Sequence, residues 1–241
     1  MTTEALFHAD PYLKTATAEI IARTEEGGVV VDRSIFYPRG GGQPGDSGRI
    51  VWAGGSAEIA STVKTPDGLG AILVPSAPAP MPVEGTEIEM LLDWDRRHRF
   101  MRMHTALHLL SVVVPLPVTG GQIGLEKSRL DFDMPEVIHD RDFIQARMTS
   151  FVEGDHPVTD TWITDAQLDA NPGLVKTLTV KPPRGAGKVR LVRIGAEENP
   201  VDLQPCGGTH VRSTGEIGAV RVGKIESKGR ANRRISITLE G

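Results

Sequence analysis

The sequence predicts an α+β protein in which a small β-barrel precedes a mixed α+β domain. Three observations lead to this fold class. Short apolar or alternating runs fill the first ninety or so residues, a helical pattern follows, and strand-like runs return toward the C-terminus. The chain has 241 residues, 39% hydrophobic and 24% charged, which suits one large or two modest soluble domains. We place the boundary so that the barrel domain spans 1–92 and the α+β domain spans 93–241.

Five barrel strands are expected, because each apolar run is bounded by Gly, Pro or Asp clusters typical of turns. These runs lie at 29–31, 49–52, 57–60, 71–74 and 87–92. The proline-rich stretch 74–82 has the composition of a linker, but a strand pattern resumes directly after it. We therefore interpret it as a long loop within the barrel.

The second domain is expected to begin with a helix that Asp95 caps and Pro115 stops. Between these two residues, apolar side chains recur at spacings of three and four. His104 and His108 lie one turn apart on one face of this helix, beside its buried stripe. Such a helix can offer two imidazoles to one ion.

The remainder of the domain alternates between helix and strand patterns. An amphipathic helix is expected over 140–152 and a short helix over 165–170, which the Asn-Pro-Gly sequence at 171–173 ends. Strand-like runs lie at 158–163, 189–194, 219–225 and 234–239. No internal repeat is visible in the sequence.

Charge and cysteine content exclude several classes of protein. A net charge of −4 argues against a general nucleic-acid coat, so any RNA contact must come from a local basic patch. A single cysteine excludes an internal disulfide and fits a reducing compartment. No start resembles a signal peptide, and no apolar run approaches the length of a membrane span. We therefore expect a cytoplasmic protein with no membrane association.

Two pairs of metal-ligating residue types stand out, and the residues of each pair are four apart. His104 and His108 form the first pair, and Cys206 and His210 form the second. Three histidines and a cysteine make a complete tetrahedral ligand set for Zn²⁺. Each pair alone is a weak signal, but two pairs that use the only cysteine favour one shared metal ion. The alternative is two core histidines and an unrelated cysteine, which leaves each buried imidazole in need of a hydrogen-bond partner.

The spacing also separates this pattern from better-known zinc motifs. A metalloprotease would carry a glutamate after the first histidine, where this chain has Thr105. A zinc finger is disfavoured because the two pairs lie too far apart in the sequence to nucleate a small metal-dependent fold. Four protein ligands usually indicate a structural ion, so catalysis at the metal would require a departing ligand or a fifth position.

The residues around both pairs resemble the editing domain of alanyl-tRNA synthetase. The first pair within 104–110, followed by Leu-Asp-Phe-Asp at 130–133, is similar to the first half of that domain. Cys-Gly-Gly-Thr-His-Val at 206–211, with Thr-Gly-Glu-Ile-Gly at 214–218, is similar to its second half.

Two further segments extend the resemblance beyond the metal motifs. The glycine-rich stretch 36–48 is similar to a motif of the barrel that precedes the editing domain, and 227–235 resembles the C-terminal end of free-standing editing proteins. Nothing in the chain corresponds to the aminoacylation, tRNA-recognition or oligomerisation parts of the synthetase. The sequence is therefore similar to the family of free-standing alanyl-tRNA editing proteins (AlaX type), in the medium-length class that keeps the barrel.

The resemblance implies a fold, an activity and partners. It implies a translation-protein-like barrel followed by an editing domain of the threonyl/alanyl-tRNA synthetase second-domain type. The implied reaction is hydrolysis of mischarged Ser-tRNA(Ala), with Gly-tRNA(Ala) as a second candidate. The implied cofactor is Zn²⁺, and the implied partner is the charged acceptor end of tRNA(Ala). We expect a monomer. Two alternatives stay open: editing of Ser-tRNA(Thr), and a non-catalytic tRNA-binding module with a structural zinc.

Two glycines between the second pair of ligands are candidate catalytic positions. Gly207 and Gly208 allow backbone N–H groups to approach the substrate, where they could stabilise a developing oxyanion. The alternative is a tight turn that aims Cys206 and His210 together.

Three polar side chains are candidates for contact with the misplaced amino acid. Thr105 follows His104, and Thr209 precedes His210. Either hydroxyl could bond the serine hydroxyl, or both could be ordinary helix and turn hydroxyls. Gln43 lies in the glycine-rich motif and could reach the pocket from the barrel. The alternative is a barrel turn that needs positive φ at 40–42.

A basic C-terminal segment is the candidate RNA footprint. Between 211 and 241 there are seven Lys or Arg against three Glu, and clustered positive charge on an otherwise acidic chain fits phosphate contact. A solvated β-hairpin is the alternative. We assign the tRNA contacts to Lys228, Arg230, Arg233 and Arg234. Further positive charge comes from Arg96, Arg97, Arg99 and Arg102 at the start of the first helix.

Overall fold

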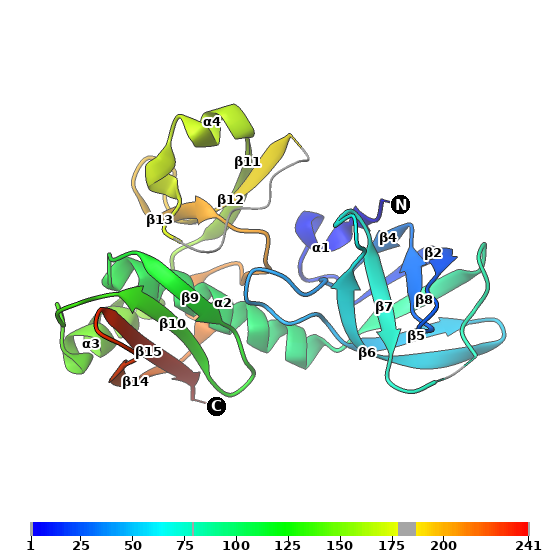
Figure 1. Cartoon of the computed structure of the whole chain (residues 1–241), viewed down its shortest axis with the longest axis horizontal. Helices are drawn as coiled ribbons and strands as arrows, with labels where there is room; N and C mark the ends of the chain where they lie inside the picture. The colour runs from blue at the N-terminus through cyan, green and yellow to red at the C-terminus, as the bar shows by residue number, and fades with distance from the viewer. Residues whose placement is uncertain (1, 79, 178–186, 241) are drawn as a thin grey trace. The chain divides into compact units, whose positions relative to one another are not determined.

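A computed structural model describes residues 2–78, 80–177 and 187–240. It confirms the predicted α+β class, with an antiparallel β-barrel in the N-terminal part of the chain (Figure 1). The chain divides into two units, Met1–Arg99 and Phe100–Gly241, and the division falls inside helix α2 (Trp94–Val113). No helix among the described residues is long and apolar enough to cross a membrane.

The first unit is a closed barrel of six strands, in which every neighbouring pair is antiparallel. Around the barrel the order is β2-β3-β7-β6-β5-β8. The strands are β2 (Thr15–Arg23), β3 (Val29–Val31), β5 (Gly48–Trp52), β6 (Gly55–Lys64), β7 (Ala71–Pro75) and β8 (Glu87–Leu92). Beside the barrel, β1 (Glu4–Ala5) pairs in parallel with β4 (Arg33–Ser34), and α1 (Leu6–Ala9) follows β1.

Alternating side chains fill the barrel interior. Ile20, Ile50, Leu73 and Met90 come from four different strands and are fully buried in one apolar cluster. All five predicted strands are present, and the proline-rich stretch lies between β7 and β8 as the expected loop. Strand β2 was not predicted, because small alanines occupy several of its alternate positions and give a weak apolar signal.

The predicted cap of helix α2 was wrong. The helix begins at Trp94, so Asp95 lies in its first turn, and Asp93 accepts a hydrogen bond from the backbone N–H of Arg96 at 3.3 Å. A carboxylate that accepts from the N–H three residues later is the usual N-cap arrangement, and an acidic residue in the first turn favours the helix dipole. The helix ends at Val113, just before Pro115, as predicted.

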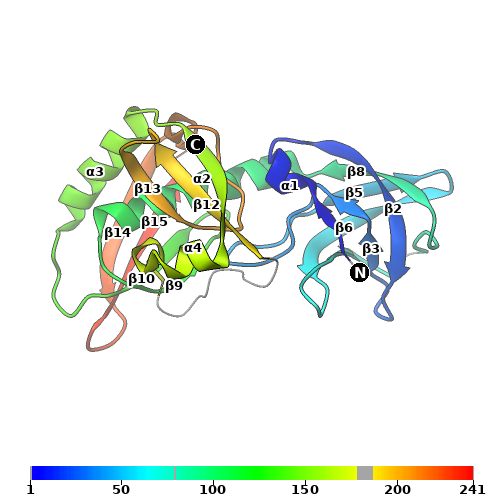
Figure 2. The same cartoon turned by 90° about the horizontal axis from the view of Figure 1, so that it is seen from above.

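The described residues of the second unit form two antiparallel sheets. The four-stranded sheet has the order β14-β15-β10-β9 and the three-stranded sheet has the order β11-β12-β13 (Figure 2). The strands are β9 (Val118–Gln122), β10 (Ser128–Asp133), β11 (Val158–Thr164), β12 (Lys188–Gly195), β13 (Pro200–Pro205), β14 (Val220–Ser227) and β15 (Asn232–Leu239).

Helices and short 3-10 turns complete this unit. They are α3 (Arg141–Glu153), α4 (Asp165–Asp169), η1 (Pro172–Leu174) and η2 (Thr214–Ile217). Helix α3 begins one residue after the predicted start, and Asp140 is its N-cap, accepting from the N–H of Phe143 at 2.8 Å. The side chain of Gln145 bonds the backbone of β14. The four predicted strands and two helices of this region are confirmed, whereas β9, β10 and β13 were not predicted as strands.

Candidate metal centre

Helix α2 presents the first two candidate ligands on one face. The side chains of His104 and His108 are both 7% exposed, and their ring centroids lie 5.2 Å apart. Residues four apart in a helix are neighbours on its surface, so the backbone places both imidazoles on the same side without strain. Leu107 and Leu110, on the same helix, are buried and anchor this region in the core.

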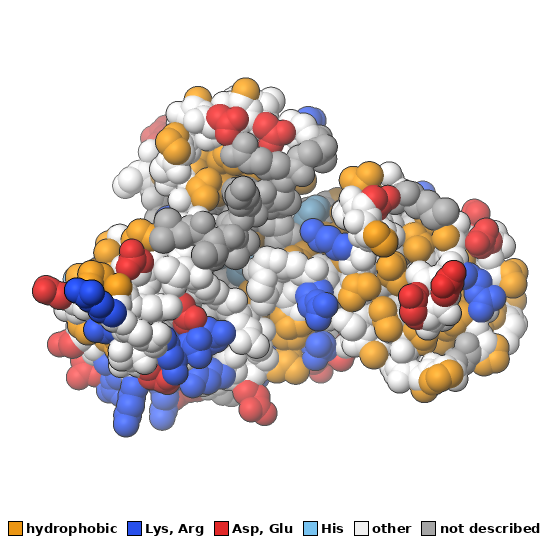
Figure 3. Space-filling model, viewed as in Figure 1, with side chains coloured by type: hydrophobic (Ala, Val, Ile, Leu, Met, Phe, Trp, Pro, Cys, Tyr) orange, Lys and Arg blue, Asp and Glu red, His pale blue; other side chains and the backbone are white. Residues whose placement is uncertain are grey.

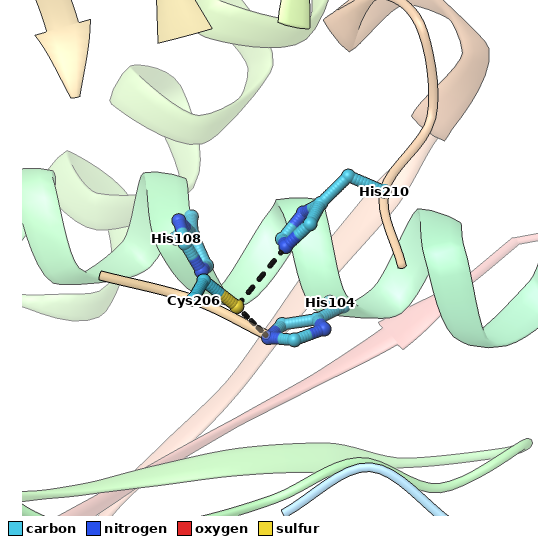
Figure 4. Close-up of side chains that lie close together, drawn as sticks. All are labelled: His104, His108, Cys206 and His210. Atoms are coloured by element: carbon cyan, nitrogen blue, oxygen red, sulfur yellow. Dashed lines mark hydrogen bonds between the residues drawn. The ribbon is translucent and has the colours of Figure 1, made fainter. Parts of the chain in front are cut away.

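The loop after β13 brings the other two candidate ligands to this helix (Figure 4). The Cys206 Sγ lies 3.4 Å from the His104 Nε2 and 3.3 Å from the His210 Nε2. One ligand atom from each of the four residues lies within 4.8 Å of all the others. The structure therefore unites the two pairs that the sequence predicted.

These distances fit a single tetrahedral metal ion. With metal–sulfur bonds of about 2.3 Å and metal–nitrogen bonds of about 2.1 Å, a tetrahedral zinc site separates S and N by about 3.6 Å. The two S···N distances approach this value. Three imidazoles and one thiolate are also donors that bind divalent transition metals well. The four residues can therefore hold a metal ion.

A carboxylate supports the imidazole of His108. Its Nδ1 lies 2.9 Å from Asp202 Oδ2, which leaves Nε2 for a metal when Nδ1 carries the proton. Lys176 Nζ contacts the other carboxylate oxygen at 2.5 Å, and Gln204 Nε2 donates to Oδ2 at 2.7 Å. Burial alone would raise the pKa of Asp202, but His108 and Lys176 lower it to about 2. This carboxylate is therefore charged and fixed in place.

Thr105 supports the imidazole of His210 in a similar way. Its hydroxyl donates to the backbone carbonyl of Met101 at 2.9 Å, and the oxygen lies 3.1 Å from His210 Nδ1. When Nδ1 donates to this oxygen, Nε2 keeps its lone pair on the side of Cys206. The Thr105 side chain is fully buried, so the structure gives it a positioning contact with a ligand. Its predicted contact with a substrate hydroxyl stays a prediction.

Arg190 holds the loop that carries Cys206. Its guanidinium donates to the carbonyls of Cys206 and Gly208 at 3.2 and 2.9 Å, and its own carbonyl accepts from the Cys206 N–H at 3.0 Å. The N–H of Gly208 donates to the Cys206 sulfur at 3.4 Å. These contacts aim the loop at α2, which agrees with a positioning turn, while the oxyanion role of Gly207 and Gly208 stays a prediction.

Burial and mutual electrostatic effects shift the pKa values of three of the candidate ligands. Burial would raise the pKa of the Cys206 thiol, but the imidazoles of His104 and His210 hold it well below its ordinary value. Burial would lower the pKa of His108, but Asp202 and the Cys206 sulfur raise it to about 9. Burial and the charge of His104 keep the pKa of His210 well below its ordinary value. Without a metal, these shifts favour the thiolate form of Cys206 beside a protonated His108.

Gln43 belongs to the barrel unit, where its side chain is fully buried. Its backbone N–H and C=O both bond Gly40, at 2.9 and 3.1 Å. Between them Gly41 and Gly42 have φ of 57° and 84°, so the expected turn needs positive φ at these two glycines. Contact between Gln43 and a substrate stays a prediction.

The candidate RNA-binding residues surround the β14–β15 hairpin. Arg234 bonds both oxygens of Asp131, at 2.7 and 2.9 Å, and Lys228 pairs with Glu226 at 2.8 Å. Arg233 donates to backbone carbonyls around the hairpin, and Arg230 is exposed. The structure thus keeps both interpretations of this segment open.

One arginine in the predicted basic group was assigned wrongly. Arg97 is fully buried in the barrel unit, where it forms an ion pair with Asp46, so it adds nothing to a surface footprint. It lies in the first turn of α2, where its guanidinium also donates to the backbone carbonyls of Ile35 and Pro11.

The residues that support the ligands were not predicted from the sequence. Asp202 and Gln204 are buried, lie two residues apart on β13 and precede Cys206. Polar residues at alternate positions of a strand, directly before a metal-ligating cysteine, were an available signal. Arg190 and Lys176 carry no such local pattern.

Replacing Asp202 with asparagine is expected to weaken metal binding about 10- to 100-fold, the usual effect of losing a carboxylate behind a histidine ligand. The amide keeps the shape of the side chain but removes the charge that orients His108. Competition with a chromophoric chelator would measure the affinity. Asp133→Asn, at an exposed position of β10, is the matched control. Equal affinities for the two variants would contradict the supporting role of Asp202.

Metal affinity is also expected to depend on pH through His108. A metal needs the neutral imidazole, so a proton competes with it. Because the pKa of His108 is about 9 in the metal-free protein, the association constant should rise about tenfold per pH unit between pH 7 and 9 and then level off. Calorimetric titration in buffers of different ionisation enthalpy would count the released protons. Release of no proton at pH 7.5 would refute this expectation.

Comparison with known proteins first defines the class. The model of the threonyl and alanyl tRNA synthetase second additional domain matches residues 189–236, which include Cys206 and His210. The barrel, this domain and the ligand cluster therefore define a protein related to the second additional domain of these synthetases.

Individual relatives define the family. The alanyl-tRNA editing protein AlaX-M of Methanosarcina acetivorans is 32% identical over 254 residues, covering 98% of this chain and 99% of the relative. AlaX-L of Pyrococcus horikoshii is 34% identical over 98% of this chain and 57% of its own length. The alanine–tRNA ligase of Pyrobaculum arsenaticum is 34% identical over 93% of this chain, but only 25% of the ligase. The chain belongs to the family of alanyl-tRNA editing proteins.

Proposed function

We propose that this protein is a trans-editing deacylase that hydrolyses Ser-tRNA(Ala), with Gly-tRNA(Ala) as a second substrate. The observation that carries the proposal is the buried cluster of three histidines and one cysteine, within a chain that aligns with AlaX-M over nearly its whole length. The proposed partner is the aminoacylated acceptor end of tRNA(Ala). We propose that the protein acts as a monomer in the cytoplasm.

We propose Zn²⁺ as the bound ion, held by His104, His108, Cys206 and His210. Such an ion supplies Lewis-acid polarisation of an ester carbonyl or orientation of the substrate. Asp202 and Thr105 keep the imidazoles in the tautomer that ligation needs, and Arg190 keeps the sulfur in place. Because four protein ligands fill a tetrahedral shell, we propose that the four ligands act mainly by organising the pocket.

Selectivity must come from recognition of the serine side chain. A pocket shaped for alanine cannot strongly reject a ligand that only adds a hydroxyl, whereas a site that must bond this hydroxyl rejects alanine by about 10⁴-fold or more. We propose that Gly207 and Gly208 line the reacting ester and that Gln43 and Thr105 contribute to recognition. Because the Thr105 hydroxyl already bonds Met101 and His210, we assign it an action through His210.

The decisive experiment uses purified protein with four substrates: Ser-tRNA(Ala), Gly-tRNA(Ala), Ala-tRNA(Ala) and Ser-tRNA(Thr). We expect release of serine from tRNA(Ala) and retention of alanine. Hydrolysis of Ser-tRNA(Thr) alone would replace the proposal with threonine-tRNA editing. Binding of tRNA without hydrolysis of any substrate would indicate a non-catalytic module with a structural metal.

A further inference from the structure

The four-stranded sheet of the second unit carries a pocket that contains none of the candidate metal ligands. Its volume is about 270 Å³. Figure 3 shows Lys and Arg side chains gathered over β10 and β15, the two central strands of this sheet. The pocket is lined by Gln122, Lys127, Arg129, Glu226, Arg234 and Ser236.

Strand register brings these side chains together. Arg129 on β10 lies opposite Gln122 on β9 and opposite Ser236 on β15, and Arg234 lies opposite Glu226 on β14. Side chains that face each other across strands lie within contact distance on one face of the sheet. Ile235 and Ile237 alternate with these residues and are fully buried, so they belong to the other face.

Ser236 is the most informative residue of the pocket. Its side chain is only 3% exposed, although it lies on the face that carries the charged residues. Its Oγ has no hydrogen-bond partner among the residues that the structure describes. A buried hydroxyl without a partner is unusual in a folded protein and marks a position where a ligand or water completes the bonding.

Positive charge surrounds this hydroxyl. Arg129 and Arg234 both bond the carboxylate of Asp131, so one anion is shared by two guanidinium groups that are held in place. Glu226 is paired with Lys228 at 2.8 Å. Lys127 is an exposed third cation of the lining. Cations in excess of carboxylates, around a buried hydroxyl without a partner, are suited to an anion with several oxygens.

We propose that this pocket binds one backbone phosphate of the tRNA. The Ser236 hydroxyl donates to a phosphate oxygen, and Lys127, Arg129 and Arg234 balance its charge. Phosphate contacts set the position of a nucleic acid without reading its sequence. The site extends the RNA footprint from the hairpin to the face of the sheet. The choice of tRNA as the ligand rests on the proposed function, whereas the anion chemistry does not.

An RNA that carries no amino acid tests phosphate binding separately from the hydrolytic activity. The probe is a fluorescein-labelled hairpin that copies the acceptor stem of tRNA(Ala), followed by anisotropy at several salt concentrations. Lys127→Ala should raise Kd about 5- to 10-fold at low salt and reduce the slope of log K against log salt by about one contact. Ser236→Ala should raise Kd about threefold with the slope unchanged, because it removes a neutral hydrogen bond.

Arg141→Ala is the matched control, because it removes an exposed cation of the same unit from the start of α3. Equal shifts for Lys127→Ala and Arg141→Ala would overturn the proposal, as would wild-type affinity in both pocket variants. If the wild-type protein hydrolyses Ser-tRNA(Ala) but the pocket variants bind RNA normally, the proposed function stands and the phosphate site is refuted. If the pocket variants bind RNA more weakly but the wild-type protein hydrolyses no substrate, the phosphate site is supported and the proposed function is refuted.

Discussion

Replacing His104 with alanine is expected to lower the kcat/KM for Ser-tRNA(Ala) by about 10³-fold. A metal ion in a hydrolytic site contributes several kcal/mol of transition-state stabilisation, and each 1.36 kcal/mol corresponds to a factor of ten in rate. His104 is one of four ligands, and its Nε2 lies 3.4 Å from the Cys206 sulfur. Its loss leaves three donors and opens the cluster to water, so both bound metal and ordering of the pocket should decline.

Single-turnover deacylation and metal analysis of the same sample would measure both effects. His139→Ala is the matched control, because this histidine stacks on Phe143 and lies outside the cluster. We expect it to retain metal and activity. RNA affinity should be unchanged in both variants. Full activity of a metal-free His104→Ala protein would refute a metal-dependent reaction, whereas lost activity with retained metal would assign His104 to the chemistry itself.

The ligand pairs could be predicted because each depends on local geometry. A spacing of four places His104 and His108 on one face of a helix whatever the rest of the fold does. The cluster itself needed one further inference, that the only cysteine joins the same site. The structure bears out this inference with Cys206 beside two of the histidines.

The supporting residues were not predictable in the same way. Asp202 and Gln204 occupy inward positions of β13, where the usual alternation would place apolar side chains. Because these two residues are polar, the sequence shows no apolar alternation and β13 was not predicted. Their polarity is explained only by the neighbouring His108, which comes from a helix far away in the sequence. Strand β9 was missed for a different reason, since Gly120 and Gly121 carry no side chain to set a pattern.

The sequence around Arg97 predicts an exposed side chain, and this prediction was wrong. In the sequence Arg97 belongs to a run of basic residues, which favours a charged surface. In the structure it is fully buried, and its guanidinium donates to Asp46, to the carbonyl of Ile35 at 2.6 Å and to that of Pro11 at 2.9 Å. Burial of a charge is tolerated only with such a set of partners, and the partners come from segments that the sequence does not place together.

Replacing Arg97 with alanine is expected to lower the free energy of unfolding by about 3–5 kcal/mol, because it leaves the buried carboxylate of Asp46 without its cation. Asp46 is 1% exposed and also accepts from the N–H of Tyr37 at 2.6 Å, so it cannot turn to water. The double variant Arg97→Met with Asp46→Leu should lose less stability than Arg97→Ala alone, because it removes both charges together. Urea unfolding followed by circular dichroism would measure these differences.

The exposed pair of Arg49 and Glu58 supplies the matched control in the same barrel. Their side chains are 54% and 57% exposed, and the two groups lie 2.6 Å apart. Because water screens such a pair, Arg49→Ala should cost about 1 kcal/mol or less. If Arg97→Ala and Arg49→Ala lowered stability equally, the buried pair would not fix the start of α2 to the segments that carry Pro11, Ile35 and Asp46. A larger loss for Arg97→Ala, partly recovered in the apolar double variant, would establish that the unpaired charge causes the destabilisation.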